Sequence, residues 1–265
     1  MLIDVHAHFF TDRSGRTDWQ ERNASRLAAG RRMGVTAHVA SILGTWGTRS
    51  PVYFPSAGDL RHANDRLAAM CADHPGVVYA YCLVNPNYTD VALAEIDARA
   101  TAGFVGIKLA ASRRATDRLL DPIAEAAAAR GLPILHHVWQ HRSREWPGQE
   151  ASDAIELGEL AARHPGTTFL LAHLGGGGDW QVSLRAIHGI PNVLVDLSGS
   201  GIDSGMLERA VETVGVVRLL WGGDVTQDTA LAKLRYLDAL GLPGEAMDMI
   251  RHGNAERVFP AGCFR

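Results

Sequence analysis

Cysteine is scarce in this chain and long apolar runs are missing, and each shortage excludes a class of protein. The cysteines Cys71, Cys82 and Cys263 are an odd number without C-x-x-C spacing, which indicates reduced thiols and no disulfide framework. No apolar stretch approaches the ~18 residues of a membrane span. The chain enters a strand pattern at once with Asp4 and His6, unlike a secretory signal peptide. We therefore expect a cytoplasmic protein with no membrane partner.

An excess of charge of either sign is also missing. The net charge is −3 and the isoelectric point is 6.4, with acidic and basic residues interspersed. The sequence has no basic stripe of the kind that binds nucleic acid and no acidic tail. Its hydrophobic content of 46% is normal for a globular protein with a sizeable core. These values favour a small-molecule substrate as the partner and disfavour a nucleic acid.

Apolar runs of strand length alternate with helical patterns from one end of the chain to the other. The expected strands occupy residues 2–8, 35–41, 77–84, 104–110, 133–138, 168–173, 193–197 and 218–223. Eight strands separated by helices predict β/α units around a parallel sheet. A (β/α)8 barrel takes about 250 residues as one domain. We therefore predict the α/β class, a TIM barrel and one domain over 1–265, with the active site at the C-terminal ends of the strands.

The first strand carries the most informative motif, two histidines spaced two residues apart. His6 and His8 end this strand, and alternate side chains of a strand point to the same face. His137, His173 and Asp224 each end a later apolar run. Because the C-terminal ends of barrel strands meet at one mouth, the pattern predicts a site there for a divalent cation such as zinc.

Strand alternation also predicts which side chains face the barrel axis. In the first strand, Ile3 and Val5 share one face, which we expect to lie under the helices. Asp4 is then expected on the axis-facing side with both histidines. In the sixth strand, the same alternation predicts that Leu170 and Ala172 point outward and that His173 points inward.

At these residues the chain resembles the amidohydrolase superfamily, in particular the amidohydrolase-related branch that contains aminocarboxymuconate-semialdehyde decarboxylase. The resemblance runs nearly end to end through IDVHAH (3–8), GFVGIKL (103–109), PILHH (133–137), FLLAHLGG (169–176), GGD (222–224) and GNAERVF (253–259). A single H-x-H motif is a weak signal. An ordered series of six segments, at spacings that fit successive barrel strands, is a strong one.

The resemblance implies a metal centre and two catalytic residues. One divalent ion, with zinc expected, would be held by His6, His8, His137 and Asp224. The family's P-x-x-x-H spacing selects His137 over the adjacent His136. Asp224 could take a proton from metal-bound water and pass it to a leaving group. His173 would contact that water or the substrate and could polarise a carbonyl group.

The substrate contacts are less defined by the sequence. Lys108 points inward and could bind a substrate carboxylate, bridge two metals if carbamylated, or pair with Asp196 or Asp224; we expect a single metal ion. Asp196 ends the seventh strand and could orient a metal ligand or have a structural role. Trp139 could wall a pocket for a flat substrate, and Arg49, on a loop after the second strand, could clamp a carboxylate.

Three functions are compatible with this pattern. The first is a metal-dependent hydrolase that acts on an ester, lactone or amide bond of a small carboxylate-bearing or cyclic substrate. The second is a non-oxidative decarboxylase of an aromatic or dienoic acid. It stays open because the class of reaction depends on loops more than on the fold. The third is a catalytically silent ligand-binding barrel, against which the full set of expected ligands argues. Relatives often form dimers, so a homodimer is compatible with the resemblance.

Overall fold

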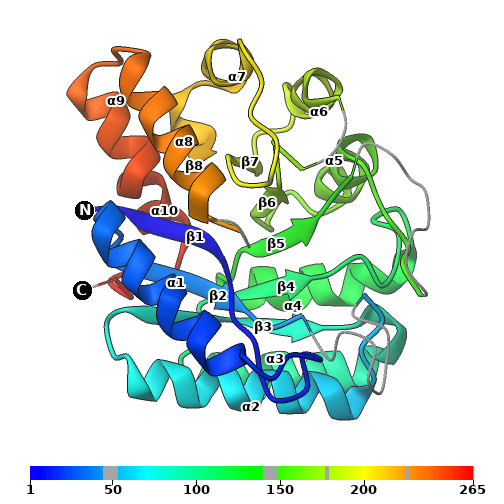
Figure 1. Ribbon diagram of the computed structural model, residues 1–265. Helices are drawn as coiled ribbons and strands as arrows, with labels where there is room; N and C mark the ends of the chain where they lie inside the picture. Colours follow the sequence, from blue (N-terminus) through cyan, green and yellow to red (C-terminus); the bar gives the residue numbers. More distant parts are fainter. Residues whose placement is uncertain (44–52, 140–147, 177–178, 225–226, 265) are drawn as a thin grey trace.

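Eight parallel strands pair in chain order in the computed structural model, which describes residues 1–43, 53–139, 148–176, 179–224 and 227–264. The strands are β1 (Ile3–His8), β2 (Ala37–Ser41), β3 (Val78–Val84), β4 (Gly106–Leu109), β5 (Ile134–His137), β6 (Phe169–Ala172), β7 (Val193–Asp196) and β8 (Leu219–Leu220). Each neighbouring pair is parallel, from β1–β2 through β7–β8. The predicted (β/α)8 barrel is therefore confirmed (Figure 1).

The first and last strands meet through a few contacts instead of a regular ladder. The amide of Val5 donates to the carbonyl of Trp221 at 3.1 Å, and the amide of Asp224 donates to the carbonyl of His6 at 2.6 Å. Ala7 and Asp224 also form an isolated parallel bridge. These contacts close the ring, and they place Asp224 directly beside the end of β1.

Helices cover the outside of the strands, and both chain termini lie at the same end of the barrel (Figure 1). The α-helices are α1 (Trp19–Met33), α2 (Ala57–Asp73), α3 (Thr89–Thr101), α4 (Asp121–Arg130), α5 (Ala154–Arg163), α6 (Trp180–Ile187), α7 (Met206–Val214), α8 (Gln227–Ala239), α9 (Gly244–Asp248) and α10 (Asn254–Val258). Shorter turns are η1 (Pro86–Tyr88), η2 (Arg118–Leu120), η3 (Val216–Arg218) and the π-helical η4 (Met249–Gly253). Within the described residues, none of the helices is both long enough and apolar enough to cross a membrane.

Local signals in the sequence explain where several helices begin and end. Asp153 and Glu156 form a reciprocal capping box at the start of α5, which satisfies amide groups that the first turn leaves free. The helices α1 and α4 end at Gly34 (φ 84°) and Gly131 (φ 61°), both left-handed. Glycine adopts this conformation without the steric cost that a Cβ adds, so it ends a helix cleanly.

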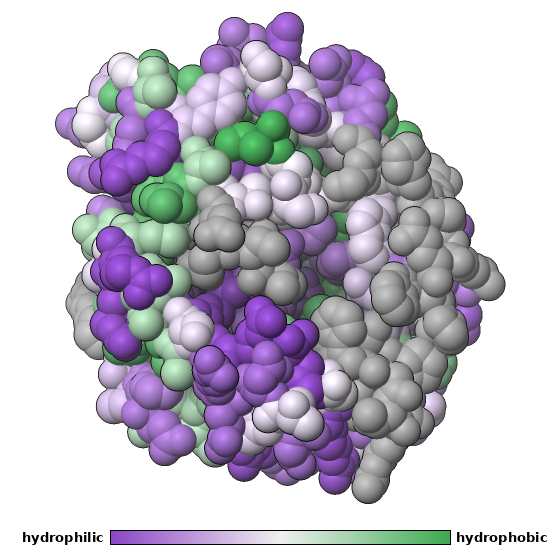
Figure 2. All heavy atoms as spheres, viewed as in Figure 1, coloured by the Kyte–Doolittle hydropathy of each residue, from purple (hydrophilic) through white to green (hydrophobic). Residues whose placement is uncertain are grey.

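Apolar side chains form two layers, one between strands and helices and one inside the barrel. The inner layer takes residues from all eight strands or their edges, together with one residue of α10 and the residue that follows it: Ile3, Val5, Ala37, Val39, Tyr81, Val105, Leu135, Leu170, Ala172, Leu194, Leu220, Ala255 and Phe259. On the face in Figure 2, hydrophilic residues cover most of the described surface, and hydrophobic residues show there as small separate patches. Burial of apolar area in these two layers is the main stabilising contribution to the fold.

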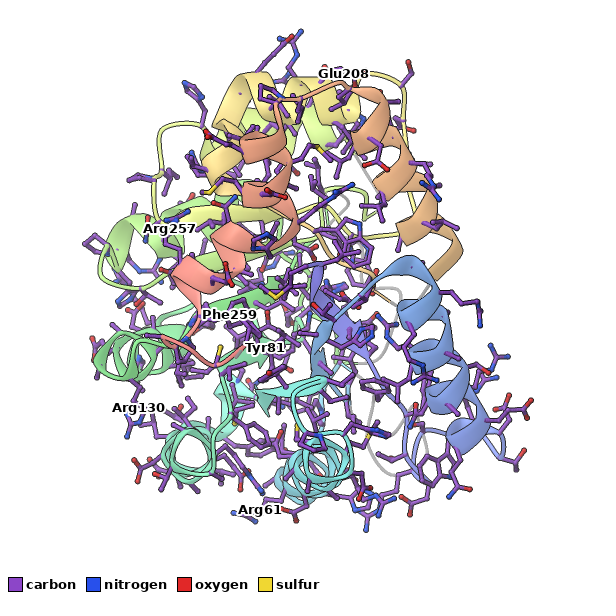
Figure 3. The ribbon with its side chains drawn as sticks, turned by 90° about the vertical axis from the view of Figure 1, so that its left-hand side faces the viewer. Arg61, Tyr81, Arg130, Glu208, Arg257 and Phe259 are labelled. Carbon is purple, nitrogen blue, oxygen red and sulfur yellow. The ribbon has the colours of Figure 1, made fainter. Side chains whose placement is uncertain are left out.

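Aromatic side chains close the barrel at the end where the strands begin. The rings of Tyr81 and Phe259 lie 5.9 Å apart, and Tyr79 and Phe264 lie 5.0 Å apart. Figure 3 shows Tyr81 and Phe259 beside one another, with Phe259 following α10. The hydroxyl of Tyr81 donates to the carbonyl of Val5 at 2.7 Å across the interior. Because apolar side chains fill this end, a polar site has room only at the opposite end, where the strands finish.

The prediction of which side chains of β1 and β6 lie under the helices is wrong in part. Ile3 and Val5 pack in the barrel interior, as do Leu170 and Ala172 of β6, although we expected all four to lie under the helices. In β1 the cause is a register shift in the β1–β2 ladder between Asp4 and Ala7, which breaks the simple two-residue alternation.

Asp4, which was expected to face the axis, instead bonds to side chains of α1 and β2. One carboxylate oxygen accepts from Arg26 of α1 at 3.0 Å and from His38 of β2 at 2.9 Å. The ring of His38 reaches α1 as well, since a Cβ at Gly30 would lie 2.5 Å from its Nε2 atom. Asp4 therefore joins the sheet to α1 and is not part of the barrel mouth.

Candidate metal centre

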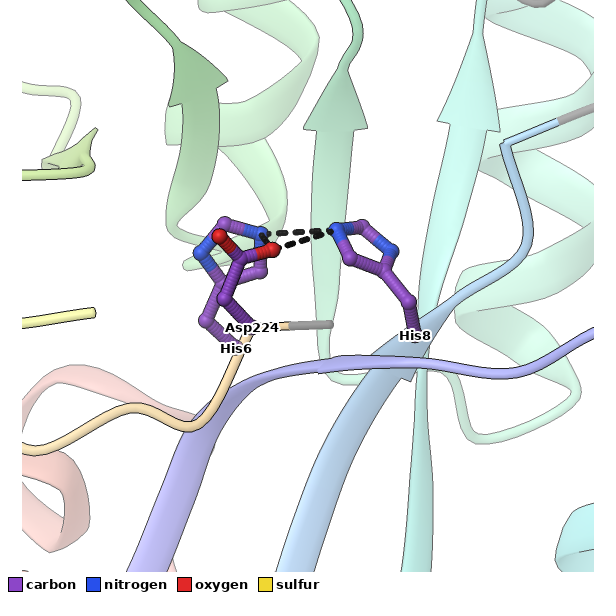
Figure 4. A group of neighbouring side chains, drawn as sticks. All are labelled: His6, His8 and Asp224. Carbon is purple, nitrogen blue, oxygen red and sulfur yellow. Dashed lines mark hydrogen bonds and ion pairs between the residues drawn. The ribbon is translucent and has the colours of Figure 1, made fainter. Parts of the chain in front are cut away.

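His6, His8 and Asp224 meet at the C-terminal end of the barrel (Figure 4). The Nε2 atoms of His6 and His8 lie 2.9 Å apart. Oδ1 of Asp224 lies 3.5 Å from Nε2 of His8 and 3.9 Å from Nε2 of His6. One possible ligand atom from each residue falls within 4.8 Å of the others. The spacing suits a divalent cation, as the sequence predicted for these three residues.

The backbone around Asp224 is held by groups on β1 and α1. Asp224 has a positive φ of 52°, which is uncommon for a residue with a side chain. Its carbonyl accepts from the guanidinium of Arg26. The other oxygen of Asp4 accepts from the amides of Gly223 at 2.7 Å and His6 at 3.1 Å. Asp4 and Arg26 thus fix the chain on both sides of the cluster.

The hydrogen-bond partners of His6 and His8 indicate which ring nitrogen carries the proton. Nδ1 of His6 lies 2.6 Å from Oδ2 of Asp196, and Nδ1 of His8 lies 3.3 Å from the carbonyl of Ser41. These oxygens accept hydrogen bonds, so each Nδ1 carries the proton and each Nε2 presents a lone pair. Two lone pairs 2.9 Å apart repel one another unless a cation lies against them. The residues therefore fit a bound metal ion.

His137 adds a third imidazole at the same mouth. Both of its ring nitrogens are buried and have no hydrogen-bond partner among the described residues. Its ring lies 4.9 Å from the ring of His173. Unpaired buried imidazole nitrogens are costly, so this ring fits the role of a metal ligand. The neighbouring His136 donates from Nδ1 to the carbonyl of His137 at 2.9 Å, and its Nε2 is also buried without a partner among the described residues, so it is the place of the His137 ring beside His173 that makes His137 the candidate ligand.

His173 stands on the other side of the Asp224 carboxylate. Its Nε2 atom lies 3.4 Å from Oδ2 of Asp224, and its ring stacks on His6 with 5.5 Å between centroids. The close approach of the following loop requires glycine: a Cβ at Gly176 would lie 1.5 Å from Nδ1 of His173. The structure thus brings both predicted catalytic residues together.

Burial keeps the imidazoles of the cluster neutral. It lowers the pKa of His6 and of His137 well below the ordinary value, and it lowers the pKa of His8 to about 3. The positive charge of Lys108 lowers each pKa further. Neutral imidazole is the form that binds metal ions. The histidines are therefore ready to act as ligands at neutral pH.

Asp224 and Asp196 are shifted in opposite directions. Burial alone would raise the pKa of Asp224, but electrostatic interactions with His173, His8 and the Lys108 ammonium hold it below its ordinary value. Asp224 is therefore ionised at neutral pH. Burial raises the pKa of Asp196 to about 7, against hydrogen bonds from the Ser198 side chain and backbone.

Lys108 is fully buried beside the cluster. Its Nζ atom lies 3.2 Å from Nε2 of His6. Burial lowers the pKa of this amine to about 8, while Asp224 and Asp196 favour its charged form. The direct ion pairs with Asp224 or Asp196 that the sequence left open are not formed among the described residues. Lys108 therefore presents a cation to the mouth of the barrel.

An aromatic wall stands beside His137. The ring of Trp139 lies 4.2 Å from the ring of His137, and the ring of Tyr53 lies 5.5 Å from Trp139 and 5.7 Å from His137. Trp139 is thus placed at the mouth, next to Tyr53. Arg49, the other predicted substrate contact, lies outside the described residues.

Residues that support the cluster were harder to find from sequence. The hydroxyl of Ser41 bonds to His8, and the hydroxyl of Ser198 bonds to Asp196. Arg26 bonds to the carbonyl of Asp224. Both serines stand at or just beyond a strand end, which is a usable signal at a barrel mouth. Arg26 lies within α1 and carries no such signal.

The fold and the cluster together define a (β/α)8 barrel enzyme of the metal-dependent class. A family model described as amidohydrolase matches residues 3–261. The chain therefore belongs to the amidohydrolase family, which confirms the resemblance found in the sequence. No curated protein matches the chain.

Several solved structures share the fold. 5-Carboxyvanillate decarboxylase from Sphingomonas paucimobilis has a TM-score of 0.71 at 19% identity, covering 97% of this chain and 98% of that one. A dihydroxybenzoic acid decarboxylase from Polaromonas sp. JS666, with bound manganese, has a TM-score of 0.72 at 16% identity, covering 97% and 96%. A candidate 2-pyrone-4,6-dicarboxylic acid hydrolase from Pseudomonas putida has a TM-score of 0.67 at 18% identity, covering 97% and 96%. At these identities the likeness shows the fold alone.

Proposed function

We propose that the protein is a metal-dependent hydrolase of an ester, lactone or amide bond in a small substrate. One divalent ion, zinc in this proposal, would be held by His6, His8, His137 and Asp224. The observation that carries the proposal is the position of the Asp224 carboxylate. Its Oδ1 atom faces His6 and His8, and its Oδ2 atom lies 3.4 Å from Nε2 of His173. One carboxylate therefore spans the candidate metal position and an acid–base group.

The metal ion would supply Lewis-acid chemistry, polarising a carbonyl group and lowering the pKa of water. Asp224 is ionised and can accept the proton that an attacking water loses. His173, next to Oδ2, can receive that proton and return it to the leaving group. The positions of these two residues thus support both proton transfers that hydrolysis needs.

Lys108 and the aromatic wall support a planar, negatively charged substrate. A buried ammonium group attracts an anion strongly because little solvent screens it. Tyr53 and Trp139 offer ring faces next to His137, and flat rings stack on such faces. A small cyclic carboxylic acid derivative, bound between the cation and the rings, fits this arrangement.

A second candidate function, decarboxylation of an aromatic acid, is favoured by the same wall and cation. The solved structures that share the fold include decarboxylases of aromatic acids. In that reaction, Lys108 would hold the substrate carboxylate and His173 would supply the proton that replaces CO2. Hydrolysis uses Asp224 as a base, whereas decarboxylation does not need that role.

Isotope labelling separates the two functions. The zinc-loaded protein would be tested on aromatic and heterocyclic carboxylic acids and on their esters and lactones, in ¹⁸O-water and in D2O. Hydrolysis places ¹⁸O in the product carboxylate, and Asp224→Asn abolishes turnover. Release of CO2, with deuterium on the substrate carbon and no ¹⁸O uptake, would replace the first proposal by the second. Absence of stoichiometric metal and of turnover would favour a silent barrel. The cytoplasmic location and the homodimer remain predictions.

A further inference from the structure

Behind His6, on the side away from the candidate metal position, lies a buried carboxylate. Oδ2 of Asp196, the last residue of β7, lies 2.6 Å from Nδ1 of His6. Both side chains have no exposed surface. A carboxylate placed without solvent is costly unless it is hydrogen-bonded, so its location on this imidazole needs a reason.

The Asp196 carboxylate is fixed by the turn that follows β7. The amide of Ser198 donates to Oδ1 at 2.9 Å, and the hydroxyl of Ser198 donates to Oδ2 at 2.5 Å. The hydroxyl also lies 3.0 Å from Nδ1 of His6. Each oxygen of Asp196 therefore has a partner, and the carboxylate cannot turn without breaking two bonds.

Space for this contact is provided by Gly222, two residues after the end of β8. A Cβ at Gly222 would lie 2.3 Å from Oδ1 of Asp196 and 3.1 Å from the Cβ of His6. Glycine at this position therefore leaves room for the carboxylate beside the imidazole. Residues of β1 and β7, and the segment that follows β8, thus contribute to one contact.

We propose that Asp196, held by Ser198, is a positioning residue of the metal centre. Its hydrogen bond keeps the proton on Nδ1 of His6 and fixes the ring, so that the Nε2 lone pair faces His8 and Asp224. In its ionised form the carboxylate also increases the basicity of Nε2, which strengthens a bond to a cation. Asp196 does not touch the ion in this role. The inference rests on the metal centre of the proposed function and adds the group that orients one of its ligands.

A purely structural role for Asp196 makes a different prediction. In that case, loss of the carboxylate would lower stability and leave metal affinity unchanged. The chain offers a matched control in Asp121, whose Oδ1 atom lies 2.8 Å from Nε2 of His164 at the junction of α4 and α5. Asp121→Asn removes the charge from a similar carboxylate–imidazole contact with no link to the candidate ligands.

The experiment measures metal affinity directly and needs no substrate. The wild type, Asp196→Asn, Ser198→Ala and Asp121→Asn would be stripped of metal and titrated with Zn²⁺ and Mn²⁺ in competition with a chromogenic chelator. We expect Asp196→Asn to weaken binding about 10- to 100-fold, Ser198→Ala to weaken it less, and Asp121→Asn to leave it unchanged. The visible spectrum of the Co²⁺-loaded protein should change in Asp196→Asn and stay constant in the control.

The outcomes separate the inference from the function on which it rests. If the wild type binds one ion and Asp196→Asn binds it equally well, with the same Co²⁺ spectrum, the positioning role is overturned and the metal centre stands. If the wild type binds no ion at the cluster, the proposed function itself fails. Should Asp196→Asn not fold, Ser198→Ala decides the matter, and unchanged affinity in that variant refutes the role.

Discussion

Single glycines set the shape of the loops around His173, and substitution at Gly175 tests how closely those loops pack. A Cβ there would lie 2.4 Å from the carbonyl of Gly201 and 3.0 Å from the carbonyl of Ser198. Both are backbone atoms of the loop after β7, so the strain cannot be relieved by turning a side chain. We expect Gly175→Ala to lower the free energy of unfolding by about 1–3 kcal/mol, as measured by urea denaturation. Gly244→Ala is the control, since a Cβ there meets nothing within 4 Å. Equal stability of the two variants would contradict the predicted close packing.

The candidate ligands could be predicted residue by residue. Of the supporting residues, the sequence named only Asp196, as one that could orient a ligand, and it did not say which ligand. His6, His8 and Asp224 stand at strand ends, and a parallel barrel brings strand ends together whatever the loops do. The bond between His6 and Asp196 joins residues 190 positions apart, and it depends on the position of β7 along the barrel axis relative to β1. No local pattern in the sequence encodes that relative position.

The positions of the strands could be predicted, but not always which of their side chains point into the barrel interior. Each expected strand overlaps an observed one, because apolar runs and helical patterns alternate regularly. The facing of β1 failed because a register shift between Asp4 and Ala7 adds an irregularity that a two-residue alternation does not contain. Leu170 and Ala172 in β6 likewise pack inside the barrel.

The junction between α4 and α5 gives a pH-dependent prediction at the scale of elements. Burial alone would raise the pKa of Asp121, but hydrogen bonds from His164, Arg163 and Arg118 lower it well below 3.8. The unfolded chain therefore binds more protons in acid, and the stabilisation is fully present above pH 3.8 and lost as the pH falls further.

Asp121→Asn should lower the free energy of unfolding by about 1–3 kcal/mol at pH 7. The difference from wild type should stay constant between about pH 7 and 5, because the unfolded carboxyl is ionised throughout that range. The difference in the free energy of unfolding should begin to decrease near pH 4. Urea denaturation of both proteins across this range is the measurement. A difference that grows on acidification would show that the carboxylate does not stabilise the junction in its charged form.

At the scale of the whole molecule, ring closure is what creates the site. The chain order of the strands followed from repeated β/α units, which connect neighbouring parallel strands with one handedness. The two ends of the barrel then meet through the Val5–Trp221 and His6–Asp224 backbone bonds. Residues from the first and last strands therefore become neighbours only when the whole barrel has formed.

This dependence on closure predicts that metal binding and global stability are linked. The proposed ligands come together only in the folded state, so an ion that binds there stabilises the fold by about 2.7 kcal/mol at 100 times its dissociation constant. We expect the melting temperature to rise steadily with added Zn²⁺ or Mn²⁺ and to fall in excess chelator, as measured by differential scanning calorimetry. Mg²⁺ should have little effect, because it prefers oxygen ligands and this cluster is rich in imidazole. Asp224→Asn should lose most of the increase. A melting temperature that is the same in chelator and in excess zinc would show that the closed barrel does not hold an ion between its first and last strands.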